Sequence, residues 1–350
     1  MTLHAVPLTA STTPHQLPPR IGRFYIKHEL GRGSLGIVYL AHDPIIDRDI
    51  ALKVLPPRLS LVEKKLHEQQ LINEARAAGR LAHANIVTIY ETATEGGITY
   101  IAMEYLQGKE LSKLLDKDGT RFNAEEVASI TWKIAEALEH AHKQGVVHRD
   151  IKPANIFMIA DQQPKLVDFG IARTPNRVSD MPQQADAPET LFQDNILGTP
   201  NYMSPEQALG QPVDARADIY SLGAVMFEML TFRKPFQAED TSKLLHQIVF
   251  KAVPEPHTIE ASIPHSLSRI VMKAMAKKVD KRYQNAGEMA LDIKRYLRRS
   301  RRDAQHGESH PKKGKARPYR LARMSLFLSL CSVTLGLAIV AYMMWHTYLP

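Results

Sequence analysis

The 350-residue sequence predicts an α+β fold, followed by one C-terminal transmembrane helix. Strand-like runs rich in β-branched and aromatic residues occupy the first third of the chain, at 24–30, 37–41, 50–54 and 100–106. Residues 63–81, between the third and fourth runs, are rich in Ala, Leu, Glu, Lys and Arg and predict a helix. Residues 324–345 carry no charge and predict a second, separate helix.

The most informative segment is residues 148–155, HRDIKPAN, followed by DFG at 168–170. Asp150 can accept the proton of a substrate hydroxyl, and Asn155 and Asp168 offer the oxygen ligands that Mg²⁺ prefers. The two runs match the H-R-D-x-K-x-x-N and D-F-G signatures of protein kinases. The chain therefore resembles a bacterial eukaryotic-like Ser/Thr protein kinase, for which a small antiparallel β lobe with one helix and a large, mainly helical lobe are expected.

A glycine-rich motif, GRGSLG at residues 31–36, lies between two of the strand-like runs. A lone G-x-G-x-x-G also fits a Rossmann turn, but that fold requires a helix directly after the glycines, whereas a β-rich run follows here. The resemblance implies a hairpin whose backbone covers the ATP phosphates, with nucleotide contacts from Leu30, Gly31, Gly33 and Gly36.

Lys53 projects from the apolar run 50–54, where a lysine without an anionic partner is costly. The alternative is a side chain that only extends to the surface. The resemblance implies that Lys53 holds the α- and β-phosphates and pairs with Glu74 of the helix that follows. Glu63 and Glu68 on the same helix are the competing partners.

The resemblance also implies an adenine pocket. The run 100–106 carries Met103 as the gatekeeper, the backbone of Glu104 and Leu106 is expected to hydrogen-bond adenine, and the run leads into a turn at Gly108. Without the flanking motifs, single apolar residues nearby would be ordinary core. Further contacts are implied for Val38 and Ala51 above the ring, Phe157 below it, and Glu110 at the ribose.

Lys152, two residues after Asp150, is the pattern of serine/threonine kinases and implies a bridge between the catalytic carboxylate and the γ-phosphate. Thr199, in GTPNY, supports the same class, since a threonine here is expected to hydrogen-bond Asp150 and Lys152. Ser-Pro-Glu at 204–206 stands where the family has Ala-Pro-Glu, a departure that leaves the assignment intact.

Three more residues are expected to be structural. By resemblance, Glu206 forms a buried ion pair with Arg282, and Asp218 anchors the backbone of the catalytic loop. Losing one of them would destabilise the lobe rather than remove the chemistry.

The segment between DFG and SPE, residues 171–203, is the expected regulatory loop. Its middle, 175–195, has no periodic pattern and predicts no regular element. Arg149 could receive a phosphate from this loop through charge-assisted hydrogen bonds. Candidate acceptors are Thr174, Ser179 and Thr190, and the alternative is a passive insertion.

Charge divides the chain into two parts. The net charge is +8, yet residues 294–323 hold twelve Lys and Arg against two acidic residues, and nothing charged follows them. That segment contributes +10, so residues 1–293 have a net charge of −2. The catalytic part is nearly neutral, and no nucleic-acid partner is expected.

The basic segment precedes the 22 uncharged residues 324–345. At about 1.5 Å per residue, a helix of this length crosses a hydrocarbon core of about 30 Å. Tyr342, Trp345 and Tyr348 form an aromatic belt at one end and the basic residues flank the other, which predicts a kinase domain in the cytoplasm. A buried core helix is the alternative. The basic residues can contact anionic lipid headgroups or can serve only to set the topology.

The predicted organisation follows from these segments. A disordered segment spans 1–21 without a signal peptide, the kinase domain 22–298 (small lobe 22–104, large lobe 108–298), a basic juxtamembrane linker 299–323, the transmembrane helix 324–345, and a short external tail 346–350. The tail is too short for an extracellular sensor domain. Cys331 lies in the predicted membrane helix, where neither a disulfide framework nor a zinc site is expected. The expected location is the inner (cytoplasmic) membrane, single-pass.

The expected reaction is γ-phosphoryl transfer from Mg²⁺·ATP, with Mn²⁺ able to substitute, to Ser or Thr of protein substrates. The loop 171–203 is expected to be one target, and a homodimer is one route to its phosphorylation in trans. A small-molecule kinase would lack the GTPNY and SPE segments. The alternative function is a catalytically silent pseudokinase or membrane scaffold, although Lys53, Asp150 and Asp168 are all present.

Overall fold

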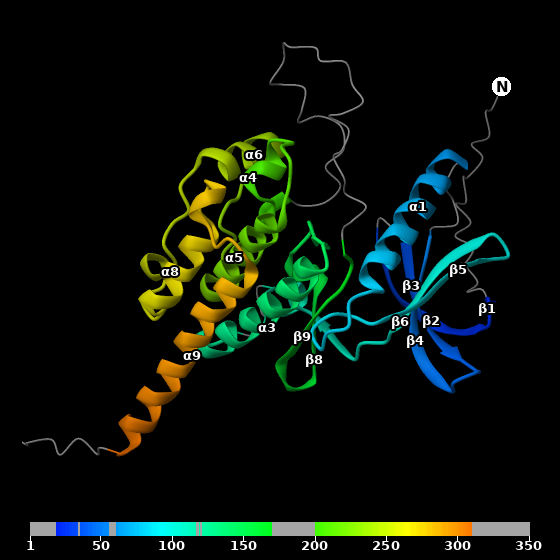
Figure 1. Cartoon of the computed structure of the whole chain (residues 1–350), viewed down its shortest axis with the longest axis horizontal. Helices are drawn as coiled ribbons and strands as arrows, with labels where there is room; N and C mark the ends of the chain where they lie inside the picture. The colour runs from blue at the N-terminus through cyan, green and yellow to red at the C-terminus, as the bar shows by residue number, and fades with distance from the viewer. Residues whose placement is uncertain are drawn as a thin grey trace, which may run out of the picture. The chain divides into compact units, whose positions relative to one another are not determined.

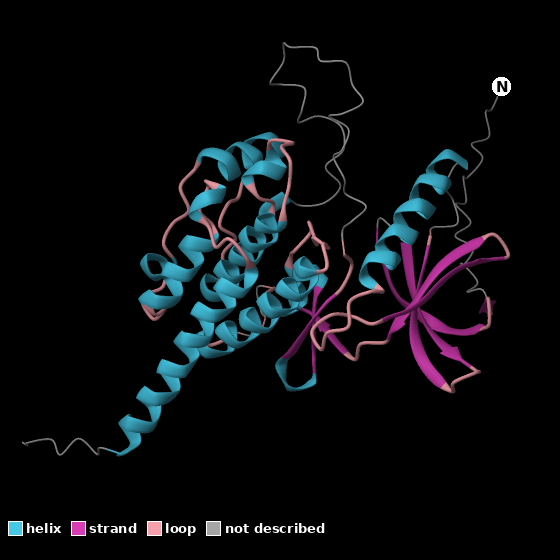
Figure 2. Ribbon diagram, in the orientation of Figure 1, coloured by secondary structure: helices cyan, strands magenta, loops and turns pink. Residues whose placement is uncertain are grey.

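The computed structural model describes residues 19–33, 36–55, 61–116, 119, 121–169 and 200–309. A strand-rich part is followed along the chain by a helix-rich part (Figure 1, Figure 2), which confirms the predicted α+β, two-lobed fold. The chain divides at Ser300 into two units. The first unit, residues 1–300, contains both lobes. Of the second unit only residues 301–309, the C-terminal end of the last described helix, are described.

The small lobe is built on an antiparallel sheet that has six strands among the described residues, in the order β1-β2-β3-β4-β6-β5. The strands are β1 (Arg20–Ile21), β2 (Phe24–Gly33), β3 (Gly36–Asp43), β4 (Arg48–Val54), β5 (Ile89–Glu95) and β6 (Ile98–Glu104). The strand-like runs 24–30, 37–41 and 50–54 fall in β2, β3 and β4, and the run 100–106 begins in β6 and continues two residues past its end. The hairpin of β2 and β3 brings Gly33 opposite Gly36, as the glycine-rich motif predicts.

One face of this sheet forms the small-lobe core. In β4, Ile50, Leu52 and Val54 pack into that core together with Phe24 and Tyr100. Because side chains alternate along a strand, Ala51 and Lys53 face the other side of the sheet. Ala51 and Lys53 are therefore the β4 residues of this stretch that are available to a binding site, whereas Ile50, Leu52 and Val54 belong to the core.

Helix α1 (Leu61–Ala78) packs on this second face through Leu71 and Ala75, which contact Ile101 of β6. The predicted helix 63–81 is shorter at its C-terminal end, because α1 stops at Ala78; the Gly79 N–H still donates to the Ala75 carbonyl at 2.8 Å.

A small second sheet joins β7 (Gly108–Glu110), β8 (Ile156–Ile159) and β9 (Gln163–Leu166). Gly108 is thus in a strand rather than in the expected turn. It pairs with Ile159, and a Cβ atom at this position would lie 2.0 Å from the Met158 carbonyl oxygen. The glycine is required for a close backbone approach, which the sequence alone does not reveal.

The large lobe is mainly helical. Its longest described helices before the C-terminal one are α3 (Ala124–Lys143) and α5 (Ala215–Thr231), and α3 begins with a capping box between Asn123 and Glu126. The other α-helices are α2 (Leu111–Leu114), α4 (Pro205–Ala208), α6 (Thr241–Phe250), α7 (Pro256–Ile259), α8 (His265–Ala274) and α9 (Ala286–Ser309). Helix α5 is buried along most of its length and forms the centre of this lobe.

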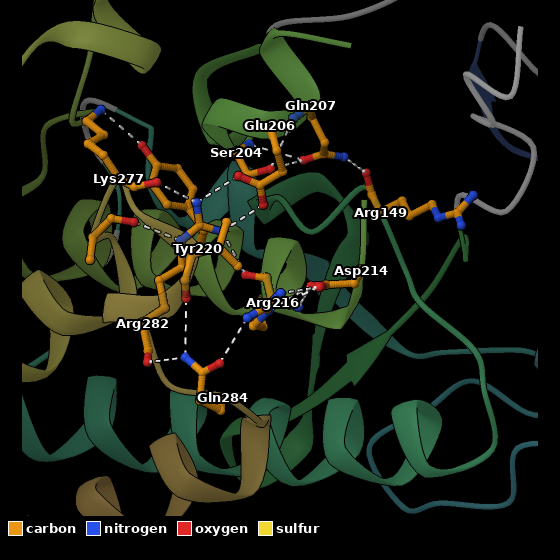
Figure 3. A network of polar contacts seen from close by, with 12 residues as sticks. Arg149, Ser204, Glu206, Gln207, Asp214, Arg216, Tyr220, Lys277, Arg282 and Gln284 are labelled. Atoms are coloured by element: carbon orange, nitrogen blue, oxygen red, sulfur yellow. Dashed lines mark hydrogen bonds and ion pairs between the residues drawn. The ribbon is translucent and has the colours of Figure 1, made fainter. Parts of the chain in front are cut away.

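The predicted ion pair between Glu206 and Arg282 is confirmed and lies in the network shown in Figure 3. The guanidinium donates to both carboxylate oxygens at 2.7 Å, and the side chains are almost fully buried. Burial alone would raise the pKa of Glu206, but the bonds from Arg282 outweigh it and hold the pKa below its usual value.

Within the described residues, no helix is both long enough and apolar enough to cross a membrane. The predicted transmembrane segment 324–345 lies outside the described residues, so it stays a prediction.

We expect Arg282→Met to destabilise the lobe by about 3–5 kcal/mol, because the Glu206 carboxylate would remain buried without its partner. Denaturant unfolding measures the change. The double variant Glu206→Met/Arg282→Met should be more stable than Arg282→Met alone. Arg295→Met, which breaks an exposed pair with Asp292, is the matched control and should cost less than about 1 kcal/mol. Equal losses for the two single variants would contradict the assignment.

Candidate active site

The second face of the small-lobe sheet gathers the predicted nucleotide residues. Val38 lies opposite Lys53 in the β3–β4 register, and Ala51 lies opposite Met103 in the β4–β6 register. These four side chains therefore share one face of the sheet, the face on which α1 packs. A Cβ at Gly36 would lie 2.4 Å from the Val54 carbonyl oxygen, so the end of the hairpin approaches β4 too closely for any other residue.

The loop after α3 is held by Asp218 of α5, as predicted. Its carboxylate, which is fully buried, accepts the backbone N–H of His148 at 2.8 Å and that of Arg149 at 2.7 Å. The His142 ring also hydrogen-bonds this carboxylate, at 2.8 Å. Charge-assisted bonds of this kind are among the strongest in proteins, so the loop backbone is fixed from the centre of the lobe.

His148 is fully buried, and burial lowers the pKa of its imidazole, which favours the neutral ring. Its Nε2 lies 3.2 Å from the Val167 carbonyl oxygen, and its Nδ1 accepts the Asp150 N–H at 3.3 Å. These partners assign the single proton to Nε2. The neutral ring of His148 thus connects the carbonyl of Val167, the residue before Asp168, with the N–H of Asp150.

Asp150 is bonded by its predicted partner Lys152 and also by Asn155, which was predicted only as a metal ligand. Its Oδ2 accepts from Lys152 Nζ at 2.8 Å and from Asn155 Nδ2 at 3.0 Å. The Asn155 amide also donates to the Asp150 carbonyl at 2.8 Å. Two bonds to one carboxylate oxygen fix the side-chain orientation of Asp150.

Asp168 meets the small lobe through Lys53, whose Nζ lies 2.7 Å from Oδ1 of Asp168. The Asp168 side chain is about half exposed, whereas Lys53 is buried. The Val167 N–H donates to the Asn155 carbonyl at 3.0 Å, which brings the two predicted metal ligands onto adjacent backbone segments. Because the Asn155 amide nitrogen bonds to Asp150, its Oδ1 is the atom suited to a cation. A carboxylate and an amide oxygen fit Mg²⁺, with nucleotide phosphates as further ligands.

The remaining predicted nucleotide residues line neighbouring elements. Leu30 and Gly31 lie in β2, Leu106 lies in the segment between β6 and β7, and Phe157 of β8 is paired with Glu110 of β7. The Glu110 carboxylate is bonded by Ser112 Oγ at 3.0 Å and Lys113 Nζ at 3.1 Å. Any contact of Glu110 with a ribose would compete with these partners.

Some predicted residues lie outside the described residues. They are Thr199, the loop candidates Thr174, Ser179 and Thr190, and the side chain of Glu74, although the backbone of Glu74 belongs to α1. Their predicted roles stay predictions.

The arrangement matches a known domain over most of the chain. The model of the protein kinase domain family matches residues 24–292. The chain belongs to the protein kinase family. A probable serine/threonine-protein kinase of Clostridium acetobutylicum is 38% identical over 272 residues, which cover 77% of this chain and 39% of that protein. The serine/threonine-protein kinase PrkC of Bacillus subtilis is 37% identical over 273 residues, 78% of this chain and 40% of PrkC.

A solved relative shares the fold of this kinase chain. The crystal structure of the Mycobacterium tuberculosis PknI kinase domain is 26% identical, with a TM-score of 0.58, and the match covers 77% of this chain and 94% of that domain. The chain spans about two fifths of the length of the curated relatives named above. These similarities extend to the kinase domain and not to the remaining parts of those longer proteins.

Sequence reasoning missed two polar residues of this kinase domain. The first is Lys165 of β9, whose Nζ lies 2.8 Å from the Glu104 carboxylate, which also accepts the Thr88 N–H at 3.2 Å. Glu104 thus uses its side chain to tie β6 to β9, in addition to the backbone role that was predicted. The second is Gln207, whose Nε2 donates a hydrogen bond to the carbonyl of Arg149, the residue before Asp150. Neither residue belongs to a motif named from the sequence.

We expect the stability of the kinase domain to depend on pH through His148. Because burial lowers the pKa of His148 in the folded state, the unfolded chain takes up a proton at this residue at a higher pH than the folded chain does. Its contribution to stability is therefore present above the unfolded pKa of about 6.5 and is lost below it, by up to about 1.4 kcal/mol per pH unit. Denaturant unfolding from about pH 7.5 to about pH 5.5 measures this loss. His148→Gln cannot titrate and should lose less stability than the wild type; parallel curves would contradict the role of His148.

Proposed function

We propose that this chain is an active serine/threonine protein kinase that transfers the γ-phosphoryl group of Mg²⁺·ATP to protein substrates. The observation that carries the proposal is the convergence of Lys152 and Asn155 on the Asp150 carboxylate, beside Asp168 in contact with Lys53. The curated relatives, which are named serine/threonine-protein kinases, support the same class.

In the proposed mechanism Asp150 orients the hydroxyl of the substrate Ser or Thr and accepts its proton. The hydroxyl oxygen forms a bond to the γ-phosphorus as the bond to the β–γ bridging oxygen breaks, so that ADP leaves. Lys152, 2.8 Å from Asp150, balances the negative charge on the transferring group. Fixing Asp150 by two hydrogen bonds lowers the cost of reaching the reactive geometry.

The nucleotide would be held from both lobes. Lys53 would bind the α- and β-phosphates, and Asp168 and Asn155 would hold the divalent cation, Mg²⁺ or Mn²⁺, which would neutralise phosphate charge. Met103, the backbone of Glu104 and Leu106, and the side chains of Val38, Ala51 and Phe157 would contact adenine. The Val167 N–H donates to the Asn155 carbonyl and so places Asn155 and Asp168 on adjacent backbone segments, which supports their assignment as ligands of one cation.

We propose that one substrate is the chain's own segment 171–203, with Thr174, Ser179 and Thr190 as the candidate acceptors. A homodimer is one route to phosphorylation in trans, and a rate of autophosphorylation that rises faster than linearly with protein concentration is the test. A catalytically silent scaffold remains the alternative function, and it would bind ATP without transfer.

We also propose that residues 324–345 anchor the kinase in the inner (cytoplasmic) membrane, with residues 1–298 in the cytoplasm and residues 299–323 beside anionic lipid headgroups. The uncharged stretch and the basic residues before it support this topology. Arg298 and Arg299 are exposed on the described part of α9, where headgroups could reach them.

We expect Asp150→Asn and Lys53→Met each to abolish phosphoryl transfer, by at least about a hundredfold, while the protein still folds. The measurement is incorporation of radiolabelled phosphate by the full chain from Mg²⁺·ATP, with label mapped by mass spectrometry and folding checked by thermal unfolding. The matched control is Lys109→Met, which removes an exposed lysine of β7 and should leave transfer unchanged.

Wild-type turnover in either variant would show that the role assigned to that residue is wrong. ATP binding by the wild type without any transfer would favour the scaffold.

We expect the full chain to remain with bacterial membranes after alkaline carbonate extraction, because a helix of 22 uncharged residues inserts stably. Removal of residues 324–350 should release the chain into the soluble fraction. A full chain that carbonate extracts would contradict the anchor. A truncated chain that leaves membranes only when salt is raised would assign the attachment to the basic linker instead.

A further inference from the structure

The residue before Asp150 has a strained backbone. Arg149 has a φ of +64°, in the left-handed region that non-glycine residues rarely occupy. Such a conformation costs about 1–2 kcal/mol and persists only where the surroundings enforce it. The contacts that enforce it here also determine where Asp150 points.

The two ends of Arg149 have different partners. Its N–H donates to Asp218, as described above. Its carbonyl oxygen accepts from Gln207 Nε2 at 2.9 Å, a contact shown in Figure 3. That carbonyl belongs to the peptide group joining Arg149 to Asp150, and the N–H of the same peptide donates to His148 Nδ1. Gln207 and His148 therefore fix both sides of the peptide plane that precedes Asp150.

Gln207 is itself held in one orientation. Its Oε1 accepts the Ser204 N–H at 3.0 Å and the Ser204 hydroxyl at 3.1 Å, in the capping box that begins α4. Because a backbone N–H can only donate, Oε1 must be the atom at Ser204 and Nε2 the atom at Arg149. The amide bridges the S-P-E segment to the loop that carries Asp150.

We infer that Gln207 is a positioning residue for phosphoryl transfer. This inference rests on the proposed kinase activity and adds a residue outside the catalytic motifs. Gln207 acts through the Arg149 carbonyl to hold Asp150 toward the substrate hydroxyl. It also couples the residues that directly follow the segment 171–203 to the catalytic carboxylate.

Gln207→Glu tests the inference with almost no change in shape. The carboxylate keeps an acceptor for Ser204 but places an oxygen against the Arg149 carbonyl, so the bridging bond is lost. We expect kcat for casein phosphorylation by the full chain to fall about tenfold, the effect of one hydrogen bond on the barrier. The KM for ATP should stay within about twofold, since the contact does not involve the predicted nucleotide residues.

Ser204→Ala is the matched control. It removes the capping hydroxyl, but the backbone N–H that orients Gln207 remains, so the thermal midpoint should fall while kcat stays near the wild-type value. An unchanged kcat in Gln207→Glu would overturn the inference. So would a tenfold loss in both variants, which would mean that α4 stability, and not positioning, sets the rate.

Hydrogen exchange separates this inference from the proposed function. In Gln207→Glu the Asp150 amide should exchange faster than in the wild type, whether or not the protein transfers phosphate. A wild type without transfer but with this difference in exchange would remove the proposed function and leave the structural role of Gln207. If the wild type transfers phosphate but the Asp150 amide exchanges at the same rate in Gln207→Glu, the inference about Gln207 is wrong and the proposed function stands.

Discussion

The geometry of the described active site depends on the buried carboxylate of Asp218. Its oxygens accept the backbone N–H groups of His148 and Arg149 and hydrogen-bond the ring of His142. A buried carboxylate without such donors would be strongly destabilised, and inward-pointing backbone N–H groups without an acceptor would be costly as well. The carboxylate and the two N–H groups therefore stabilise one another. The conformation of the loop that carries His148 and Arg149 is set by this contact with α5 and not by the loop's own backbone preferences.

The positions of the two functional carboxylates follow from that anchor. With its N–H fixed, His148 directs Nε2 to the Val167 carbonyl, next to Asp168, and Nδ1 to the Asp150 N–H. A protonated ring would lose the acceptor at Nδ1, so the low pKa that burial imposes is also what keeps this connection intact. Asp150 and Asp168 are separated by 17 intervening residues but are placed relative to one another by one neutral side chain.

Features that depend on spacing along one segment could be predicted from the sequence. The alternation of β4 predicts that Lys53 and Leu52 face opposite sides, and the motif around Asp150 predicts the contact with Lys152. Gly108 could not be assigned in the same way. Glycine suggests a turn when only neighbours are considered, whereas its requirement here is the approach of the Met158 carbonyl, a contact between residues far apart in the chain.

Contacts between distant segments limit what one sequence can reveal. Glu104 and Lys165 are 61 positions apart, and Arg149 and Gln207 are 58 apart, so no local pattern couples them. The run Ser204-Pro205-Glu206-Gln207 nevertheless contains a local signature, Ser followed three residues later by Gln, which is a capping box. Sequence reasoning treated Ser204 only as a departure from Ala-Pro-Glu. The capping box fixes one end of the Gln207 amide, and only the fold determines that its other end meets the backbone beside Asp150.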